Sequence, residues 1–375
     1  MNINIENVVY LYIGVCICML LFNCVLIFYR KTEYVYSKKH LIRYEKLVET
    51  QIEHIKKQEA IDTDIQNRLQ KKLRDLRHLQ EFHYAIENIS EKNEQLCKTY
   101  LKECKPEFIK LAIVYRQRET MQKAYFAYLM SVYKLCEPGE QNAIVDTMRQ
   151  FVFDKSAYCR ENALKALYSF GDEKNIYYAL KLINDNGIFH HTKLITDGLL
   201  TFSGDHDKLA ELFWNNLNNF SLEMQVSFIN YIRIVSDRYR ENFYNLLNEK
   251  TLNKDIEINI IRYFGKYHYK PIKSILLDYL TVDNKKDWEI IAVACSVLRE
   301  YKGDDTLSAL IQSLNHQNWY IRHNAAESLH SLQPNYQELA VIYNGNNRYA
   351  REMLDYQRQK SRINELSISE VTGNW

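Results

Sequence analysis

The sequence predicts an all-α protein: an α-solenoid of stacked helical hairpins, preceded by an N-terminal transmembrane helix and a helical linker. Three observations lead to this fold class. Only 10 Gly and 4 Pro occur among 375 residues, too few for a fold with many tight β-turns. One uncharged apolar run lies near the N-terminus, and a unit of about 32 residues recurs in the C-terminal half.

Composition places the chain among folded proteins and gives no sign of a nucleic-acid partner. Hydrophobic residues make up 46% of the chain, and 49 Lys and Arg nearly balance 47 Asp and Glu. The 29 tyrosines suggest ring stacking on a ligand, but abundant Asn, Ile and Lys with little Ala indicate codon bias and helix packing. The cysteines outside the apolar run form no Cys-x-x-Cys pair, so we expect free thiols, no bound metal and no cofactor.

The apolar run at 8–29 has the length of a membrane span. It holds about 22 residues without a charge, which at 1.5 Å per residue matches a hydrocarbon layer of roughly 30 Å. Basic residues follow it and none precedes it: Arg30, Lys31, Lys38, Lys39, Arg43 and Lys46. The positive-inside rule then predicts a single-pass protein of the cell membrane, with 1–7 outside and the C-terminal domain in the cytoplasm. Asn23 either bonds a partner helix or reaches interfacial water.

The segment 30–89 is predicted as a basic juxtamembrane stretch followed by a charged helical linker. Residues 41–87 contain no Gly or Pro and carry a narrow apolar stripe. The heptad pattern slips near 60–64, so a coiled-coil stalk and a helical hairpin packed on the repeats both remain open. Residues 90–139 are predicted as a divergent start of the repeats, 140–360 as the repeat domain and 361–375 as a flexible tail.

Two stretches, 154–167 and 316–329, show the repeat most clearly. They are offset by 162 residues, about five units of 32. Five residues of the first recur in register in the second: Tyr158, Arg160, Asn162, Ala163 and Leu167 against Tyr320, Arg322, Asn324, Ala325 and Leu329. Gly-Asp pairs at 171–172, 204–205 and 303–304 are expected to end one helix and begin the next. We expect the second helices of the hairpins to start near Ser156, Ile188, Ser221, Asp255, Asp287, Asn318 and Asn347.

These stretches resemble the HEAT-repeat family, whose second helix opens with Asp, an apolar residue and Arg, followed by Ala and Leu positions. The resemblance implies a curved scaffold of HEAT-like hairpins that binds partners. It also implies that Arg160, Ala163, Arg322 and Ala325 are structural repeat residues. In the family, the Arg ties its helix to an acidic residue of the neighbouring repeat.

A search for catalytic or metal-binding patterns finds none. Di-iron relatives of this architecture carry His-Glu pairs, and no His is followed by Glu here. Phosphate-binding glycine loops, His-Glu-x-x-His and Gly-x-Ser-x-Gly are absent from the sequence. His190 with His191, and Asp205, His206 and Asp207, come nearest to metal-ligand clusters, but capping and solvation explain both. We therefore predict no enzyme activity.

A basic and aromatic strip is the candidate partner-binding site. Its residues are Arg233, Arg262, Tyr263, Lys266, Tyr267 and Lys270. It either docks an acidic partner or membrane surface, or forms an ordinary solvated ridge, since Asp237, Glu241 and Glu257 dilute its charge.

The predicted function is a scaffold or adaptor that binds another protein, with no small-molecule substrate. Residues 121–128, between the apolar run and the repeats, resemble membrane-anchored HEAT proteins of low-GC Gram-positive bacteria, often encoded beside a processive glycosyltransferase. That resemblance implies an accessory of a membrane glycosyltransferase making an exported polysaccharide. The alternative is a HEAT-like enzyme with a cryptic site on the concave face.

Overall fold

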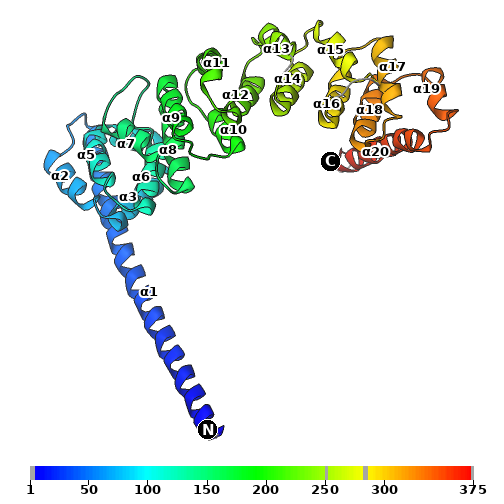
Figure 1. Ribbon diagram of the computed structural model, residues 1–375. Helices are drawn as coiled ribbons and strands as arrows, with labels where there is room; N and C mark the ends of the chain where they lie inside the picture. The colour runs from blue at the N-terminus through cyan, green and yellow to red at the C-terminus, as the bar shows by residue number, and fades with distance from the viewer. Residues whose placement is uncertain (1–4, 250–251, 282–285, 373–375) are drawn as a thin grey trace. The chain divides into compact units, whose positions relative to one another are not determined.

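The computed structural model describes the backbone of residues 5–249, 252–281 and 286–372, and the side chains of 10, 12–28, 31, 36–249, 252–281 and 286–360. Every regular element in these ranges is a helix. The chain forms two compact units, Met1–Ala179 and Leu180–Trp375, and α9 (Glu173–Asp185) crosses from one to the other. Each unit is an all-helical assembly (Figure 1). The all-α prediction is confirmed.

The first unit begins with one long helix and continues with short ones. Its elements are α1 (Ile5–Lys56), α2 (Thr63–Lys72), α3 (Leu76–Ser90), α4 (Glu94–Glu103), α5 (Lys105–Tyr115), α6 (Thr120–Tyr133), α7 (Ala143–Phe151) and α8 (Ala157–Phe170). The C-terminal part of α1 packs along α3, while its N-terminal part extends away from the other helices of this unit (Figure 1). Further along the unit, α6 packs on α8 and α5 on α7.

The predicted linker forms a packed hairpin, not a coiled-coil stalk. Tyr44, Val48 and Ile52 of α1 are buried. They lie on the face that packs on α3, where Phe82 is also buried and its ring centroid is 6.0 Å from that of Tyr44. The chain leaves the helical conformation after Lys56, and Asp62 caps α2 by accepting from the backbone of Asp64 and Ile65. The heptad slip in the sequence marks this turn.

The transmembrane prediction is wrong. Within the part of the chain that the structure describes, no helix provides a stretch long and apolar enough to cross a bilayer. Residues 8–29 are helical, as part of α1, but the transmembrane span predicted there and the single-pass topology, with its outside N-terminus and cytoplasmic domain, are corrected by this finding. Residues 1–4 of the predicted N-terminal segment lie outside the described residues.

The second unit alternates two sets of helices. One set is α10 (Thr192–Leu200), α12 (Leu222–Val235), α14 (Lys254–Lys266), α16 (Trp288–Leu298), α18 (Trp319–Leu332) and α20 (Arg348–Thr372). The other is α11 (His206–Asn215), α13 (Arg240–Leu247), α15 (Ile272–Tyr279), α17 (Asp304–Ser313) and α19 (Tyr336–Tyr343), with the short 3₁₀ helix η1 (Leu217–Asn219) before α12. Each helix of the first set packs on the next member of that set. Each helix of the second set, α11, α13, α15, α17 and α19, packs on the helix that follows it in the chain. This is the stacked-hairpin arrangement of an α-solenoid.

Local sequence sets the helix boundaries where the repeat pattern predicted them. Ser156, Ser221, Asp287 and Asn318 are the N-cap residues of α8, α12, α16 and α18, while α10 begins four residues later than predicted. Gly171 ends α8 in the left-handed region with φ 70°, a conformation that favours glycine. The side chain of Asp172 then accepts from the backbone N–H of Asn175 at 2.7 Å, at the start of α9.

Side chains tie the stacked helices of the second unit to one another. Ser328 Oγ of α18 donates to the carbonyl of Cys295 in α16 at 2.8 Å, and Asn324 Nδ2 donates to the carbonyl of Ala292 at 2.8 Å. Phe213 of α11 and Phe228 of α12 are fully buried, with ring centroids 4.0 Å apart. Each hairpin therefore buries its apolar face against its neighbours, as expected for repeats that cannot form a core alone.

The predicted boundary at 139/140 and the flexibility of 361–375 stay predictions. The unit boundary after Ala179 is drawn from compactness and not from the repeat pattern. The last helix, α20, continues to Thr372, and 373–375 lie outside the described residues.

Candidate partner-binding surface

The predicted basic strip lies on α12, α14 and the segment that follows α14. Arg233 is half-buried and donates from Nε and an Nη to Asn230 Oδ1, at 3.1 and 2.6 Å. Burial, and next the charge of nearby Arg262, lower the pKa of Arg233. Arg262 and Lys270 are exposed. The structure therefore places three of the four cations of the strip, Arg262, Lys266 and Lys270, at the surface and holds Arg233 against its own helix.

The aromatic part of the strip mostly belongs to the interior. Tyr263 is fully buried, and its hydroxyl accepts from the backbone N–H of Tyr239 at 3.0 Å, so its side chain adds nothing to a surface. Lys266 Nζ donates to the carbonyl of Ile234 at 2.8 Å and lies 4.8 Å from the centre of the Tyr267 ring. Tyr267 is half-buried. These contacts within the chain weaken the strip as a docking site.

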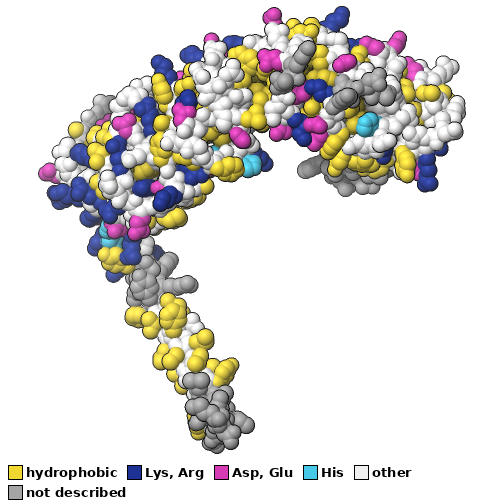
Figure 2. Space-filling view, viewed as in Figure 1, with side chains coloured by type: hydrophobic (Ala, Val, Ile, Leu, Met, Phe, Trp, Pro, Cys, Tyr) yellow, Lys and Arg dark blue, Asp and Glu magenta, His cyan; other side chains and the backbone are white. Residues whose placement is uncertain are grey.

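A second surface, which the sequence analysis missed, gathers exposed aromatic rings on α16 and α18. The ring of Trp288 stacks on that of Tyr320 with centroids 4.9 Å apart, and Tyr320 meets the ring of Trp319 edge-on at 5.1 Å. Their exposed fractions are 40% for Trp288, 48% for Trp319 and 54% for Tyr320. We call these three residues the aromatic cluster. Figure 2 shows hydrophobic side chains reaching the surface at several places along the second unit.

His323 packs against the aromatic cluster. Its ring stacks on that of Trp319 with centroids 4.7 Å apart, and its Nδ1 shares a hydrogen bond with Gln357 of α20 at 3.1 Å. Burial lowers the pKa of His323, which favours the neutral ring at physiological pH. The cluster thus stands on three stacked helices, a rigid base for recognition.

Helix starts explain why these rings are exposed. Trp288 and Trp319 each follow an N-cap residue, Asp287 and Asn318, and so stand in the first turn of their helices. The second helical position carries Tyr158 in α8, Tyr320 in α18 and Tyr349 in α20, with exposed fractions of 57%, 54% and 65%. The recurring Tyr was visible in the sequence, but its exposure was not, because packing was taken to explain the tyrosines.

Ion pairs border the aromatic cluster. Lys254 of α14 pairs with Glu289, which follows Trp288 in α16, at 2.9 Å, and Glu327 of α18 lies 3.8 Å from Nε2 of His323, whose ring stacks on that of Trp319. Large aromatic rings surrounded by charged groups match the anatomy of a protein interface, with an apolar centre and a polar rim.

The structural repeat residues lie at matching positions of α8 and α18. Ala163 and Ala325 are fully buried. Arg322 Nη1 donates to the carbonyls of His316 and Gln317 at 2.8 and 2.7 Å, and Arg160 Nη1 donates likewise to the carbonyls of Asp154 and Lys155 at 2.9 and 3.1 Å. These bonds fasten each helix to its own preceding loop. The predicted tie to an acidic residue of the neighbouring repeat stays a prediction.

The two sequence clusters that came nearest to metal sites serve as caps and hydrogen-bond partners. Asp205 is the N-cap of α11, and His191 Nδ1 accepts from the N–H of Lys193 at the start of α10. His206 Nδ1 lies 2.8 Å from the Tyr231 hydroxyl, and Asp207 pairs with Arg238 at 3.1 Å. Asp205 and His191 therefore act at helix starts, whereas His206 and Asp207 bond other side chains.

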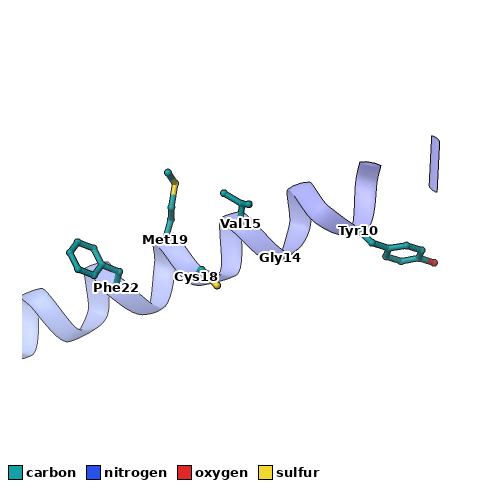
Figure 3. A pocket seen from close by; sticks show the side chains of 6 residues that line it. All are labelled: Tyr10, Gly14, Val15, Cys18, Met19 and Phe22. Carbon is teal, nitrogen blue, oxygen red and sulfur yellow. The ribbon is translucent and has the colours of Figure 1, made fainter. Parts of the chain in front are cut away.

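Two hollows in the described surface can be compared with the requirements of an active site. Six residues of α1, Tyr10, Gly14, Val15, Cys18, Met19 and Phe22, line an open apolar hollow formed by one helix alone (Figure 3). A second hollow lies between α17 and α19, and its single carboxylate, Glu338, is engaged in the capping box with Asn335. Within the described residues, neither hollow provides the clustered carboxylates or histidines that the enzyme alternative requires.

One hairpin of the second unit can be assigned by comparison. Residues 307–336 match the HEAT repeat family model. This HEAT repeat covers most of α17 and all of α18, the hairpin that carries Trp319, Tyr320 and Arg322. The match supports the predicted HEAT-like hairpins and a helical scaffold fold. It gives no support to the resemblance with membrane-anchored bacterial proteins.

The other comparisons add little. A crystal structure of an engineered protein, a Northeast Structural Genomics Consortium target, aligns over 67% of this chain and 77% of its own, with 11% identity and a TM-score of 0.33. At that TM-score the likeness carries no argument. None of the curated proteins compared with the chain matches it in sequence.

Proposed function

We propose that this chain is a helical scaffold that binds a protein partner through the aromatic cluster of α16 and α18. The observation that carries the proposal is the contact among Trp288, Trp319 and Tyr320, three large rings that remain about half exposed. Trp and Tyr dominate the energetics of protein interfaces because they bury much apolar surface and have few rotatable bonds. An exposed cluster of this kind on stacked helices supports a recognition role.

The exposed cations of the basic strip add a second contact. Arg262 and Lys270 lie on the same unit as the aromatic cluster, and an acidic rim on the partner would meet them. Such rim charges affect the association rate more than the affinity. The cluster therefore provides most of the binding free energy, and the strip guides the encounter.

For the identity of the partner, the proposal follows the resemblance of residues 121–128. It implies a membrane glycosyltransferase that makes an exported polysaccharide, and this enzyme is the first partner to test. Deletion of the gene should then reduce surface polysaccharide. Unchanged polymer would leave the scaffold proposal standing and remove this partner.

The cluster itself is tested by substitution in the full chain. W288A/W319A should weaken capture of the glycosyltransferase at least about 30-fold, because even one Trp truncation at an interface centre costs about 2 kcal/mol. Y336A is the matched control, since Tyr336 is 67% exposed and stacks on Tyr343 of α19, outside the cluster. Circular dichroism should show equal helix content in all three proteins. Equal partner capture by W288A/W319A and Y336A would refute the role of the cluster.

A further inference from the structure

A polar cluster lies between α1 and α3 in the first unit, outside the surfaces described above. It consists of His40 from α1 with His78 and Glu81 from α3. Glu81 Oε2 is 3.3 Å from Nδ1 of His40 and 3.3 Å from Nδ1 of His78. The three ligand atoms all lie within 4.8 Å of one another. His78 and Glu81 share a helix face at i and i+3, and the packing of α1 on α3 adds His40.

The carboxylate of Glu81 is buried without hydrogen bonds. The residue is 2% exposed, and neither Oε1 nor Oε2 has a hydrogen-bond partner among the described residues. An ionised carboxylate in this situation is strongly unfavourable unless a cation balances it. The two imidazoles are the groups placed to do so, either as cations themselves or as ligands of a metal ion.

Geometry favours the ligand role. The rings of His40 and His78 are stacked, with centroids 5.1 Å apart, so two imidazolium cations here would repel each other. Neutral imidazoles have no such cost, and each can offer a lone pair. Both Nδ1 atoms lie at the same distance from one carboxylate oxygen without an N–H···O hydrogen bond to it. This is the convergence expected around a shared ion.

We propose that His40, His78 and Glu81 bind Zn²⁺. Two imidazole nitrogens and one carboxylate oxygen are a recurrent zinc ligand set, with a water in the fourth position. Zinc–ligand bonds of about 2.0–2.1 Å in a tetrahedron place ligand atoms about 3.3 Å apart, and both His–Glu distances are 3.3 Å. The side chains of His40 and His78 are 14% and 25% exposed, which leaves a route for the ion and its water. Figure 2 shows histidine side chains at the surface where α1 meets the other helices of the first unit.

Tyr44 adds a second layer to the site. Its hydroxyl lies 3.2 Å from Nδ1 of His78, and the residue is 5% exposed. Binding of zinc at this nitrogen would replace that hydrogen bond. The ion would then join α1 to α3 by coordinate bonds, so metal binding and the stability of this hairpin are coupled.

The test uses the full chain, stripped of metal with a chelator, and Zn²⁺ alone as the probe. Calorimetric titration should give one Zn²⁺ per chain, and Co²⁺ should give the visible absorption of a tetrahedral site. H40N, H78N and E81Q should each weaken binding by more than the 10–100-fold typical of a lost outer-shell partner. H54N is the matched control, because His54 lies on the same helix as His40 and is 2.7 Å from Glu59 in the turn after it, while both side chains are exposed.

Melting temperatures separate metal binding from folding. Zn²⁺ should raise the melting temperature of the unsubstituted chain and of H54N but leave that of E81Q unchanged. Without metal, E81Q should melt no lower than the unsubstituted chain, because its neutral amide removes an uncompensated buried charge. Any of three results would overturn the proposal: no stoichiometric Zn²⁺, binding retained in E81Q, or equal loss of binding in H54N.

Discussion

Replacement of Arg322 by Ala tests the structural logic of the repeat. The guanidinium makes two hydrogen bonds to carbonyls, at 2.8 and 2.7 Å, and its centre lies 5.5 Å from the ring of Tyr349 in α20. Hydrogen bonds to a charged group contribute about 1.5–3 kcal/mol when buried, but solvent near these exposed carbonyls reduces that to roughly 1 kcal/mol each. The cation–π contact adds about 0.5 kcal/mol. R322A should therefore destabilise the hairpin of α17 and α18 by at least about 2 kcal/mol.

Native-state hydrogen exchange measures this loss locally. Repeat proteins open in segments, so the amides of 316–329 should exchange about 30-fold faster in R322A, the factor that 2 kcal/mol represents. R348A is the control, because Arg348 is 79% exposed and makes only a surface pair with Glu352 of the same helix. Exchange in R322A within twofold of the unsubstituted chain, or equal effects of R322A and R348A, would refute the assigned role.

Two further predictions concern the second unit. Burial, and next the charge of Arg322, lower the pKa of His316, whose Nδ1 accepts from the N–H of Asn318 at 2.9 Å. In the unfolded chain the pKa of a His is about 6.5, so on acidification His316 is protonated in the unfolded chain before it is protonated in the folded one. The contribution of neutral His316 to the free energy of unfolding is therefore present above about pH 6.5 and is lost as the pH falls below it. In H316D the new carboxylate can accept from Asn318 N–H, as Asp154 accepts from the N–H of Ser156. This substitution should reduce the difference between the melting temperatures at pH 5.5 and 7.5. An unchanged difference would show that His316 does not cause it. F228A should cost about 3–5 kcal/mol in urea unfolding, because Phe228 is fully buried against Phe213, whereas Y336A at an exposed site should cost under about 0.5 kcal/mol.

Helix positions were predictable because they depend on local chemistry. Ser156, Asp287 and Asn318 precede apolar periods in the sequence, and each stands at the N-cap position of a helix in the structure, where Asn318 also accepts from the backbone N–H of Tyr320. The absence of glycine and proline from 41–87 likewise predicted helix there. What local pattern left open was how that helix packs, since an apolar stripe fits a coiled coil and a hairpin equally well. The contacts of α1 with α3 decide it.

The candidate sites were less predictable because they depend on exposure and on distant pairing. Tyr263 and Tyr267 are four residues apart and were assigned to one surface, but Tyr263 points into the core. The Zn²⁺ ligands His40 and Glu81 come from helices separated by a turn and a further helix, so no spacing rule connects them. The membrane span was predicted from the hydropathy of the sequence, and among the described residues no helix has a stretch that is both long and apolar enough to cross a bilayer.

The recurring Tyr and Arg of the repeat make two different kinds of contact. The Arg, as in Arg160 and Arg322, bonds the loop before its own helix. The Tyr two positions earlier reaches the preceding helix of the same set: Tyr320 contacts Trp288 of α16, and Tyr349 contacts Arg322 of α18. Because each such ring covers its neighbour with one face only, about half of it stays in solvent. The same position that links one repeat to the next therefore also presents an aromatic surface, which is why an interaction site can arise here without a departure from the repeat pattern.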